Sequence, residues 1–341
     1  MSSIKEIAAD VGVSHALVSR VLNNRMGTTR VSEKTKQAIL DRAKALNYTP
    51  NQVAVALKSG RKGAIGLFLH GVGIEGTELS KIFIETASRV MAEKGFNLWL
   101  QFFRNKGEFL KSCNENLLQK VDGLIVAGIA HEELIENLKH INQLGLPVVT
   151  ACHGKLPQEE IPNFSVNSEA QGYLTTKHLL DAGCQRIAHF KTRDTFERFE
   201  GFLRAHQERD LQPDEQLIID TNGYSSHDGF TATKELISRM AVFDGISTHS
   251  DSQAAGALRY FALNAIDRSL WPKITGIDNS PIARFYSLIP LTSATAEMET
   301  CAELSVQAII RMLHKEMVKG QTVQPKLVIR ESTLQEKHQP T

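Results

Sequence analysis

The sequence predicts a small all-α module followed by a large α/β body. Residues 1–62 carry 11 Lys and Arg against 4 Asp and Glu, a net charge of +7, whereas the rest of the chain carries 28 against 34, a net charge of −6. Apolar residues recur at helical spacing up to Leu46, and from Ala64 onward short apolar runs alternate with helical patterns. This charge asymmetry indicates a cationic module for a polyanion, attached to a body with a different role.

Three short helices are expected in the basic module. The first covers Ile4–Ala9 and ends near Gly12, which suits a tight turn. Ser14 is a good N-cap for the second helix, and the third runs from Ser32 to Leu46. Two short helices joined by a Gly-containing turn and packed on a third form a helix-turn-helix. A three-helix protein-interaction bundle would show the same apolar faces, but the net charge favours contact with phosphates.

Several blocks at fixed spacing cover this module: Ser3–Ala8, Val11–Ser14, Val18–Asn23, Val31–Thr35 and Leu46–Asn51. Together they resemble the DNA-binding headpiece of the LacI/GalR family of bacterial transcriptional regulators. The resemblance implies that the start of the second helix reads bases in the major groove, and Arg20 suits guanine O6 and N7. The base-reading residues it implies are His15, Ala16 and Arg20. The phosphate contacts it implies are Ser14, Ser19, Asn23 and Thr35.

Two features of the module depart from the family pattern or extend it. Leu17 stands where the family commonly has Thr, so an apolar contact replaces a hydroxyl contact. The segment 24–30 is longer than usual and is either a further phosphate contact or a solvated loop. Residues 50–63 resemble the family's hinge helix and linker, in which Leu57 would wedge into the minor groove. A plain interdomain linker is the alternative for this stretch.

Strands and helices alternate along the body. The expected strands are Ala64–Leu69, Asn97–Phe102, Gly123–Ala127, Pro147–Ala151, Arg186–Phe190, Gln216–Asp220, Asp244–Thr248 and Lys273–Ile277. The expected helices are Leu79–Lys94, Glu132–Leu144, Ala170–Ala182, Phe196–Arg209, Gly229–Arg239 and Ser252–Asn264. Such alternation predicts parallel sheets with binding sites at the carboxyl ends of the strands.

One motif in the body supports an enzyme interpretation. Gly71–Gly76 is a GxGxxG after a strand and before a helix, the context of a dinucleotide site. The next strand ends without an acid for a ribose hydroxyl, although Arg104 could serve a 2′-phosphate. A cytosolic nucleotide-binding protein or NAD(P)-dependent oxidoreductase is therefore the alternative. No catalytic set, metal site or cofactor is predicted elsewhere, and His153, His189 and His249 are expected to be scattered surface histidines.

The family resemblance continues through the body in these blocks: Val121–Ile125, Leu146–Val149, His178–Gly183, Asp251 followed by Ala255–Ala257, Gly276–Asn279, Pro290–Ser293 and Val328–Thr333. It implies an α/β type I periplasmic-binding-protein-like effector domain of two subdomains, with a small ligand between them. The implied boundaries are a headpiece at 1–49, a hinge and linker at 50–63, and an effector-binding and dimerisation domain at 64–341. Within that domain, the N-subdomain covers about 64–165 plus 293–324, and the C-subdomain about 166–292 plus 325–341.

The resemblance also implies an effector site. Arg198, Tyr224 and Asp278 match the family's ligand-binding arginine, stacking aromatic and acid. Ser80, Cys152 and His153 fall at family pocket positions but depart from the usual residues, so the effector is expected to be atypical. The alternatives are a surface ion pair for Arg198, core packing for Tyr224 and a helix N-cap for Asp278.

The remaining observations concern compartment and assembly. Four widely spaced cysteines suggest reduced thiols, no apolar run is long enough for a membrane span, and the first residues lack the apolar core of a secretion signal. A cytoplasmic location is expected. The tail Leu334–Thr341 is too short for a tetramerising heptad helix. The family resemblance therefore implies a homodimeric transcriptional regulator, expected to be a repressor, that binds palindromic double-stranded operator DNA under control of a small-molecule effector such as a sugar.

Overall fold

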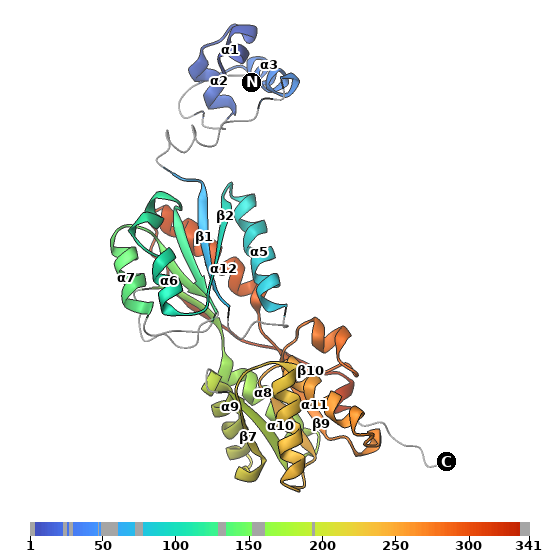
Figure 1. The fold of residues 1–341 in the computed structure, drawn as a ribbon. Coiled ribbons are helices and arrows are strands. Elements are labelled where there is room, and N and C mark those ends of the chain that lie inside the picture. The colour runs from blue at the N-terminus through green and yellow to red at the C-terminus, as the bar shows by residue number, and fades with distance from the viewer. Residues whose placement is uncertain are drawn as a thin grey trace. The chain divides into compact units, whose positions relative to one another are not determined.

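The computed structural model describes residues 4–22, 26, 30–46, 48, 61–71, 78–128, 134–151, 161–192 and 195–334. The chain separates into two compact units, Met1–Gly63 and Ala64–Thr341. The first unit is helical, and the second contains two six-stranded sheets (Figure 1). The predicted fold class, an all-α headpiece with an α/β body of two subdomains, is confirmed.

Local capping explains where the helices of the first unit begin and end. These helices are α1 (Ile4–Val11), α2 (His15–Leu22) and α3 (Glu33–Ala45). The Ser14 Oγ atom accepts a hydrogen bond from the Leu17 backbone N–H at 3.2 Å, and the Ser32 Oγ atom accepts one from the Thr35 N–H at 3.1 Å. Gly12 has a φ of +69°, which ends α1 and turns the chain into α2.

The core of the first unit is small and apolar. Ile7 of α1, Val18 of α2 and Ile39 of α3 are completely buried, and Leu17, Leu46 and Tyr48 pack around them. Each helix therefore contributes one apolar face to a shared centre, as the periodicity predicts.

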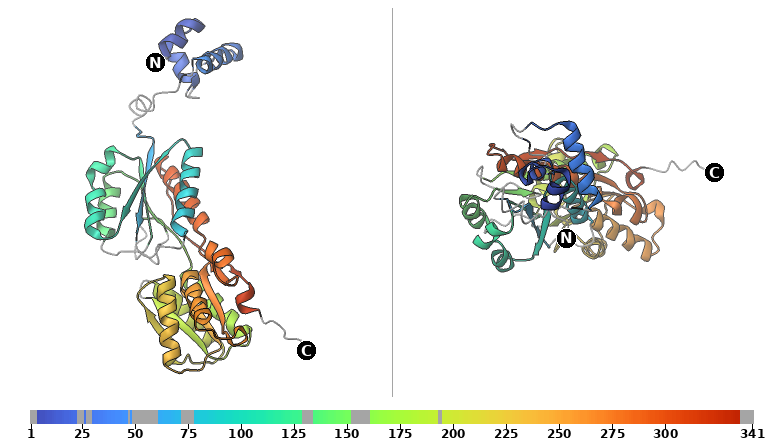
Figure 2. Two further views of the ribbon diagram at one scale, coloured as in Figure 1. Left: turned by 45° about the vertical axis from the view of Figure 1, so that its right-hand side comes forward. Right: turned by 90° about the horizontal axis from the view of Figure 1, so that it is seen from above.

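The first sheet of the body has the strand order β11-β5-β4-β3-β1-β2, and its paired strands are parallel. Its strands are β1 (Ala64–His70), β2 (Asn97–Phe103), β3 (Gly123–Ala127), β4 (Val148–Ala151), β5 (Asn163–Val166) and β11 (Gln321–Val323). The helices α5 (Leu79–Glu93) and α12 (Met298–Leu313) cover one face, and α6 (Lys106–Ser112) and α7 (Ile135–Gln143) cover the other (Figure 2).

The second sheet has the order β12-β10-β9-β8-β6-β7, parallel except for β12. Its strands are β6 (Ile187–Thr192), β7 (Ile218–Thr221), β8 (Gly245–Thr248), β9 (Lys273–Asp278), β10 (Thr292–Thr295) and β12 (Leu327–Val328). The helices α8 (Ser168–Asp181) and α9 (Phe196–Gln207) pack on one face, and α10 (Ser226–Ser238) and α11 (Asp251–Leu263) on the other.

Glycines bring the paired helices of the second sheet into backbone contact. A Cβ atom on Gly201 of α9 would lie 2.0 Å from the backbone oxygen of Glu169 in α8, and one on Gly172 of α8 would lie 1.9 Å from the backbone oxygen of Arg198. Only glycine permits this approach, so α9 is held against α8 at a fixed position. This contact sets where Arg198 lies.

All eight expected strands are confirmed within two residues, and the expected helices are confirmed within three where they are described, with α10 beginning at Ser226 and not at Gly229. The sequence did not predict α6, α12 or the four strands β5, β10, β11 and β12. These strands have two to four residues and lie beside the chain crossings between the sheets, so they lack a long apolar signature. The expected subdomain boundary at residue 293 falls inside β10, which pairs with β9 of the second sheet.

Two further expectations concern side chains and spans. Cys113, Cys184 and Cys301 are buried free thiols, and Cys152 lies outside the described residues. Burial raises the pKa of the Cys113 thiol to about 12 and that of Cys184 to about 11, so neither is a reactive thiolate. Among the described residues, no helix has the length and apolar character that a membrane crossing requires.

Candidate DNA-binding surface and effector site

The helix α2 has one buried and one exposed face. Val18 and Val21 are buried, whereas His15, Ala16 and Arg20 are exposed. The three residues expected to read bases therefore share the outer face of the helix, two in its first turn and Arg20 in its last. This is the geometry that lets a helix present side chains to a groove.

The residues flanking that face have structural roles as well. Ser14 caps α2, and Thr35 is held at the start of α3 by a hydrogen bond of 2.8 Å between its hydroxyl and that of Ser32. Ser19 and Leu17 are half-buried, and Leu17 packs on the headpiece core. An apolar residue at position 17 is thus explained by packing, whatever it contacts on DNA.

One basic side chain of the module is engaged within the headpiece. The Arg42 Nε atom of α3 lies 2.7 Å from the Asp10 carboxylate of α1. This ion pair joins the first and third helices and is itself neutral, so the net charge of +7 comes from the other side chains of the module.

Some predicted site residues lie outside the described part of the chain. They are Asn23, Leu57 with the rest of 49–60, Cys152, His153 and residues 72–76 of the GxGxxG motif. Their expected roles remain predictions.

The other predicted effector residues gather at one edge of the second sheet. Asp278 is the last residue of β9, Tyr224 follows β7 by three residues, and Arg198 lies in the first turn of α9 after β6. All three therefore lie at carboxyl ends of parallel strands, where α/β folds bind ligands. Ser80 lies in the first turn of α5, after β1 of the first sheet.

Arg198 is anchored rather than solvent-exposed. Its Nε atom donates to Gln171 Oε1 of α8 at 3.2 Å, its Nη1 atom donates to the His249 backbone oxygen, and its Nη2 atom lies 3.9 Å from Asp278 Oδ1. Its side chain is only 11% exposed. The alternative of a surface ion pair is therefore wrong, because the partners of Arg198 are buried.

Asp278 occupies a strained and buried position. Its φ is 118°, a value that side-chain-bearing residues rarely adopt, and Asn279 after it has a φ of 50°. The nearby 282–286 turn is capped by Pro281, so Asp278 is not a helix N-cap. Burial raises the pKa of the Asp278 carboxyl well above its ordinary value, and nearby Asp251 raises it further, whereas Arg198 lowers it.

Asp251 stabilises the backbone around Asp278. Its Oδ2 atom accepts hydrogen bonds from the Ser280 N–H at 2.8 Å and the Ser280 hydroxyl at 2.9 Å, and its Oδ1 atom accepts one from Ser293 at 2.5 Å. Burial raises the pKa of Asp251 to about 6, despite these bonds. The sequence analysis missed this role, although Asp251 stood within a recognised block.

Tyr224 is half-buried, and hydrogen bonds fix both its backbone and its ring. The Ser250 hydroxyl, the N-cap of α11, donates to the Tyr224 carbonyl at 2.7 Å. The Tyr224 hydroxyl donates to Thr195 Oγ1 at 3.2 Å. Tyr224 is thus held at the sheet edge and does not belong to the apolar core.

The expectation that His189 and His249 are surface residues is wrong. Both are fully buried, with exposed fractions of 1% and 0%, and their Nε2 atoms lie 2.9 Å apart. The His189 ring also stacks on Phe202 of α9. No local pattern reveals such a pair, because the two residues are 60 positions apart and meet only when β6 pairs with β8.

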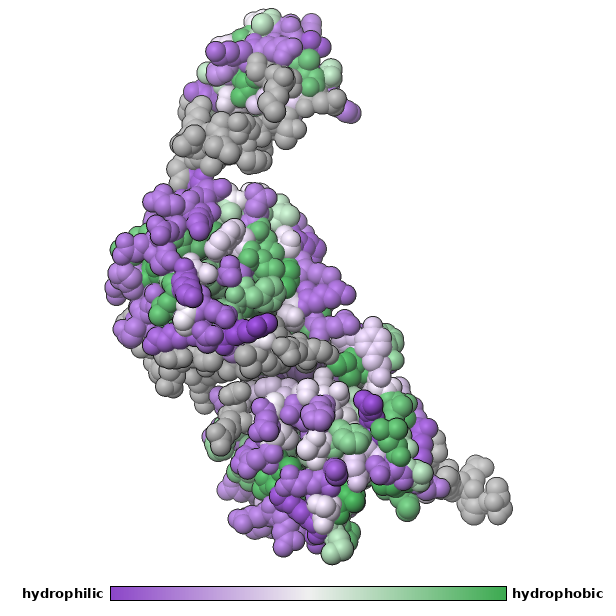
Figure 3. All heavy atoms as spheres, in the orientation of Figure 1, coloured by the Kyte–Doolittle hydropathy of each residue, from purple (hydrophilic) through white to green (hydrophobic). Residues whose placement is uncertain are grey.

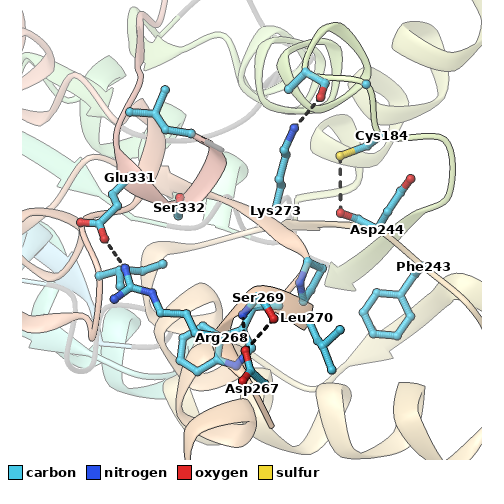
Figure 4. A pocket seen from close by; sticks show the side chains of 16 residues that line it. Cys184, Phe243, Asp244, Asp267, Arg268, Ser269, Leu270, Lys273, Glu331 and Ser332 are labelled. Carbon is cyan, nitrogen blue, oxygen red and sulfur yellow. Dashed lines mark hydrogen bonds and ion pairs between the residues drawn. The ribbon is translucent and has the colours of Figure 1, made fainter. Parts of the chain in front are cut away.

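A separate pocket of about 670 Å³ lies at the opposite, amino edge of the second sheet (Figure 4). Its charged side chains bind one another or the backbone: Arg268 pairs with Glu331, and Lys273 donates to the Ala182 carbonyl. Since these groups are engaged within the fold, the pocket lacks the converging free polar groups of a small-molecule site.

Two family models match the chain. Residues 3–51 match the bacterial regulatory proteins of the lacI family, and residues 176–333 match the periplasmic binding protein-like domain. These segments contain the helical headpiece and the second sheet with the residues predicted to bind the effector.

Relatives and solved structures agree with this match. The chain is 30% identical to the HTH-type transcriptional repressor PurR of Actinobacillus pleuropneumoniae serotype 5b (strain L20), over 97% of this chain and 98% of that protein. It is 28% identical to the ribose operon repressor of Halalkalibacterium halodurans, over 98% and 97%. A lac repressor dimer bound to operator and the anti-inducer ONPF has a TM-score of 0.79 at 20% identity, covering 98% of this chain and 99% of that one. A CelR-cellobiose complex has a TM-score of 0.71 at 21% identity, covering 97% and 100%.

The fold and the two sites define a transcriptional regulator with a helix-turn-helix headpiece and a periplasmic-binding-protein-like body. The chain belongs to the lacI family of bacterial regulatory proteins.

Proposed function

We propose that this protein is a repressor that binds a palindromic operator through α2. Its affinity for the operator falls or rises when a small molecule binds its second unit. The single observation that carries the DNA-binding part is the outer face of α2, where His15, Ala16 and Arg20 are exposed within a basic module, residues 1–62, of net charge +7. Proteins that read the major groove place such a helix face against the base edges, while nearby basic side chains and helix N-cap residues contact phosphates.

A selection experiment tests this function. The full-length protein is used to select duplexes from a random library, and binding to the enriched and scrambled sequences is then measured over a salt series. We expect a palindromic site that binds at least 1000-fold more tightly than scrambled DNA, roughly the lower limit for specific regulators. Equal affinity for both sequences at every salt concentration would refute the proposal.

Arg20→Ala sharpens the test of base reading. A bidentate arginine–guanine contact contributes about 1–3 kcal/mol of discrimination. We expect relaxed preference at one position of each half-site, with the salt dependence almost unchanged. Lys5→Ala is the matched control on the same headpiece, and it should leave sequence preference intact.

The effector site is proposed to consist of Arg198, Tyr224 and Asp278, with Ser80, Cys152 and His153 contributing from other segments. An arginine, an aromatic ring and a carboxyl at one sheet edge suit a sugar or related metabolite. The relatives support this class, since one is named for a ribose operon and one solved structure holds cellobiose. Thermal-shift measurements with D-ribose, cellobiose and a metabolite panel test it, and Arg198→Ala should abolish any stabilisation.

The assembly is proposed to be a homodimer in the cytoplasm, without enzymatic activity. Leu100 and Phe102 on the edge strand β2 and Phe285 and Tyr286 after β9 are exposed apolar residues. Figure 3 shows hydrophobic side chains gathered where β2 and α5 lie. Sedimentation at several concentrations should give a dimer, and Phe102→Asp together with Phe285→Asp should give monomers.

The alternative of a nucleotide-binding protein or NAD(P)-dependent oxidoreductase is tested by fluorescence titration with NADPH. We expect no binding, because the chain belongs to a family of transcriptional regulators and its relatives are named as repressors.

A further inference from the structure

His189 and His249 form a buried polar pair that the proposed function does not yet explain. His189 lies within β6 and His249 directly follows β8, and their Nε2 atoms are 2.9 Å apart. In such a contact one nitrogen must donate and the other must accept. The direction of this bond can be deduced from the other partners of His249.

The Nδ1 atom of His249 is an acceptor. The Thr192 backbone N–H donates to it at 3.2 Å, and a backbone N–H can only donate. Burial lowers the pKa of His189 to about 3 and lowers that of His249 well below its ordinary value. The cationic or titratable groups that face the pair, Lys191 of β6 with Arg198 and His206 of α9, lower these pKa values further.

Both rings are therefore neutral at physiological pH. A neutral imidazole carries its proton on one nitrogen only, so His249 carries it on Nε2 and donates it to His189 Nε2. His189 then carries its own proton on Nδ1. The two histidines therefore have different tautomers, Nε2–H in His249 and Nδ1–H in His189. The Thr192 backbone N–H of β6 sets this arrangement.

The same acceptor orders the hydroxyl groups next to it. The Thr192 hydroxyl lies 2.8 Å from His249 Nδ1, the Thr195 hydroxyl lies 3.1 Å from it, and the two hydroxyls are 3.0 Å apart. Nδ1 has one lone pair and no proton, so it can only accept from this pair of hydroxyls, either from each directly or from one that in turn accepts from the other. The Thr195 oxygen in turn accepts the proton of Tyr224 at 3.2 Å.

His249 also positions Arg198 through its backbone. Its carbonyl oxygen accepts from Arg198 Nη1, and its N–H donates to Gln253 Oε1 at 2.9 Å. One residue thus fixes both the guanidinium and, through two threonines, the phenol of the effector site.

We propose that His249 is a positioning residue of the effector site and that its Nε2–H tautomer makes the Tyr224 oxygen a hydrogen-bond acceptor toward the effector. The effector then presents a hydroxyl or N–H donor to Tyr224. This proposal rests on the effector role of Tyr224 and Arg198. It predicts that the site binds compounds with a hydrogen-bond donor facing Tyr224 and rejects compounds with an acceptor there. Such selectivity is strong when the groups are buried.

The tautomers can be measured on the full-length protein labelled with ¹⁵N-histidine, by long-range ¹H–¹⁵N correlation spectra between about pH 5 and pH 8. His249→Asn and His189→Gln assign the signals, and either variant suffices if the other fails to fold. We expect His249 as Nε2–H and His189 as Nδ1–H, neither titrating over this range. A proton on Nδ1 of His249, or an ordinary histidine titration of either ring, would overturn the proposal.

The phenol is tested by the infrared C–O stretch of ring-labelled tyrosine, as the difference between wild type and Tyr224→Phe. In the wild type we expect the band position of a phenol that donates its proton. Thr195→Val should shift this band, because it removes the acceptor of the Tyr224 hydroxyl. The control Thr86→Val, in α5 beside the first sheet, should leave the band unchanged. A band unaffected by Thr195→Val would contradict the inference. Neither measurement uses DNA, so its failure is distinguishable from failure of operator binding.

Discussion

The two sheets of the body share a topology but differ in what their interiors contain. In the first sheet, the strands β1 and β3 bury apolar residues such as Ile65, Leu67 and Ile125. In the second sheet, a buried polar row crosses neighbouring strands at one register: His189, Ser247, Thr275 and Thr292. Apolar burial is non-directional, whereas hydrogen bonds fix orientation, so the second sheet is built for defined side-chain geometry.

The largest expected effect comes from the close helix contact of the second sheet. Gly201→Ala places a Cβ atom within 2.0 Å of the Glu169 backbone oxygen, so α8 and α9 must separate. We expect a loss of about 3 kcal/mol in the free energy of unfolding, measured in urea. Gly107→Ala, in α6 of the first sheet's half, serves as the control and should change it by no more than about 1 kcal/mol.

Removal of a buried carboxyl tests whether the polar interior of the second sheet stabilises the fold. Asp251→Ala leaves the Ser280 N–H and the Ser280 and Ser293 hydroxyls without their acceptor. We expect a loss of about 2 kcal/mol, the usual penalty for unpaired buried groups. Glu136→Ala, an exposed carboxylate, should cost less than about 0.5 kcal/mol. Equal losses would show that burial of Asp251 has no special consequence.

The histidine pair should make stability depend on pH. His189 has a pKa of about 3 in the folded chain, against an ordinary value of 6.5, so below pH 6.5 the unfolded chain binds a proton that the folded chain does not. Stability is therefore full above pH 6.5 and falls as the pH drops toward 3. The slope reaches about 1.4 kcal/mol per pH unit for one such group. Summed from pH 7 to pH 5, this group should lower the free energy of unfolding by about 2 kcal/mol. His189→Gln should remove that loss, and an unchanged pH dependence would argue against a neutral buried ring.

The smallest expected effect belongs to the first sheet. Ile125→Val removes one buried methylene from an apolar interior and should cost about 1 kcal/mol. Because no titrating group is involved, the loss should be the same at pH 7 and pH 5. A loss that differed between pH 7 and pH 5 would contradict the distinction between an apolar first sheet and a polar second sheet.

Much of the fold could be predicted from the sequence, because apolar runs of four to eight residues separated by helical patterns are local signals. The short strand β10, beside a chain crossing, gave no such signal. At the proposed effector site, Arg198, Tyr224 and Asp278 could be selected by family resemblance. Their anchoring could not, because it depends on contacts between residues far apart in the chain.

The histidine pair shows this limit most clearly. His189 and His249 each read as an ordinary polar residue near a strand end. Only the register between β6 and β8 brings them together, and that register is set by the whole sheet. The φ of Asp278 is equally invisible locally, since the tertiary contacts of Asn279 and Ser280 maintain it.

The central claim is that the carboxyl edge of the second sheet controls binding of DNA by the headpiece. The most direct measurement is the operator Kd with and without the compound that gives the largest thermal shift, for wild type and for Arg198→Ala. We expect that compound to change the wild-type Kd at least about tenfold, a coupling of about 1.4 kcal/mol, and to leave the Kd of Arg198→Ala unchanged. An equal response of both proteins would contradict the claim.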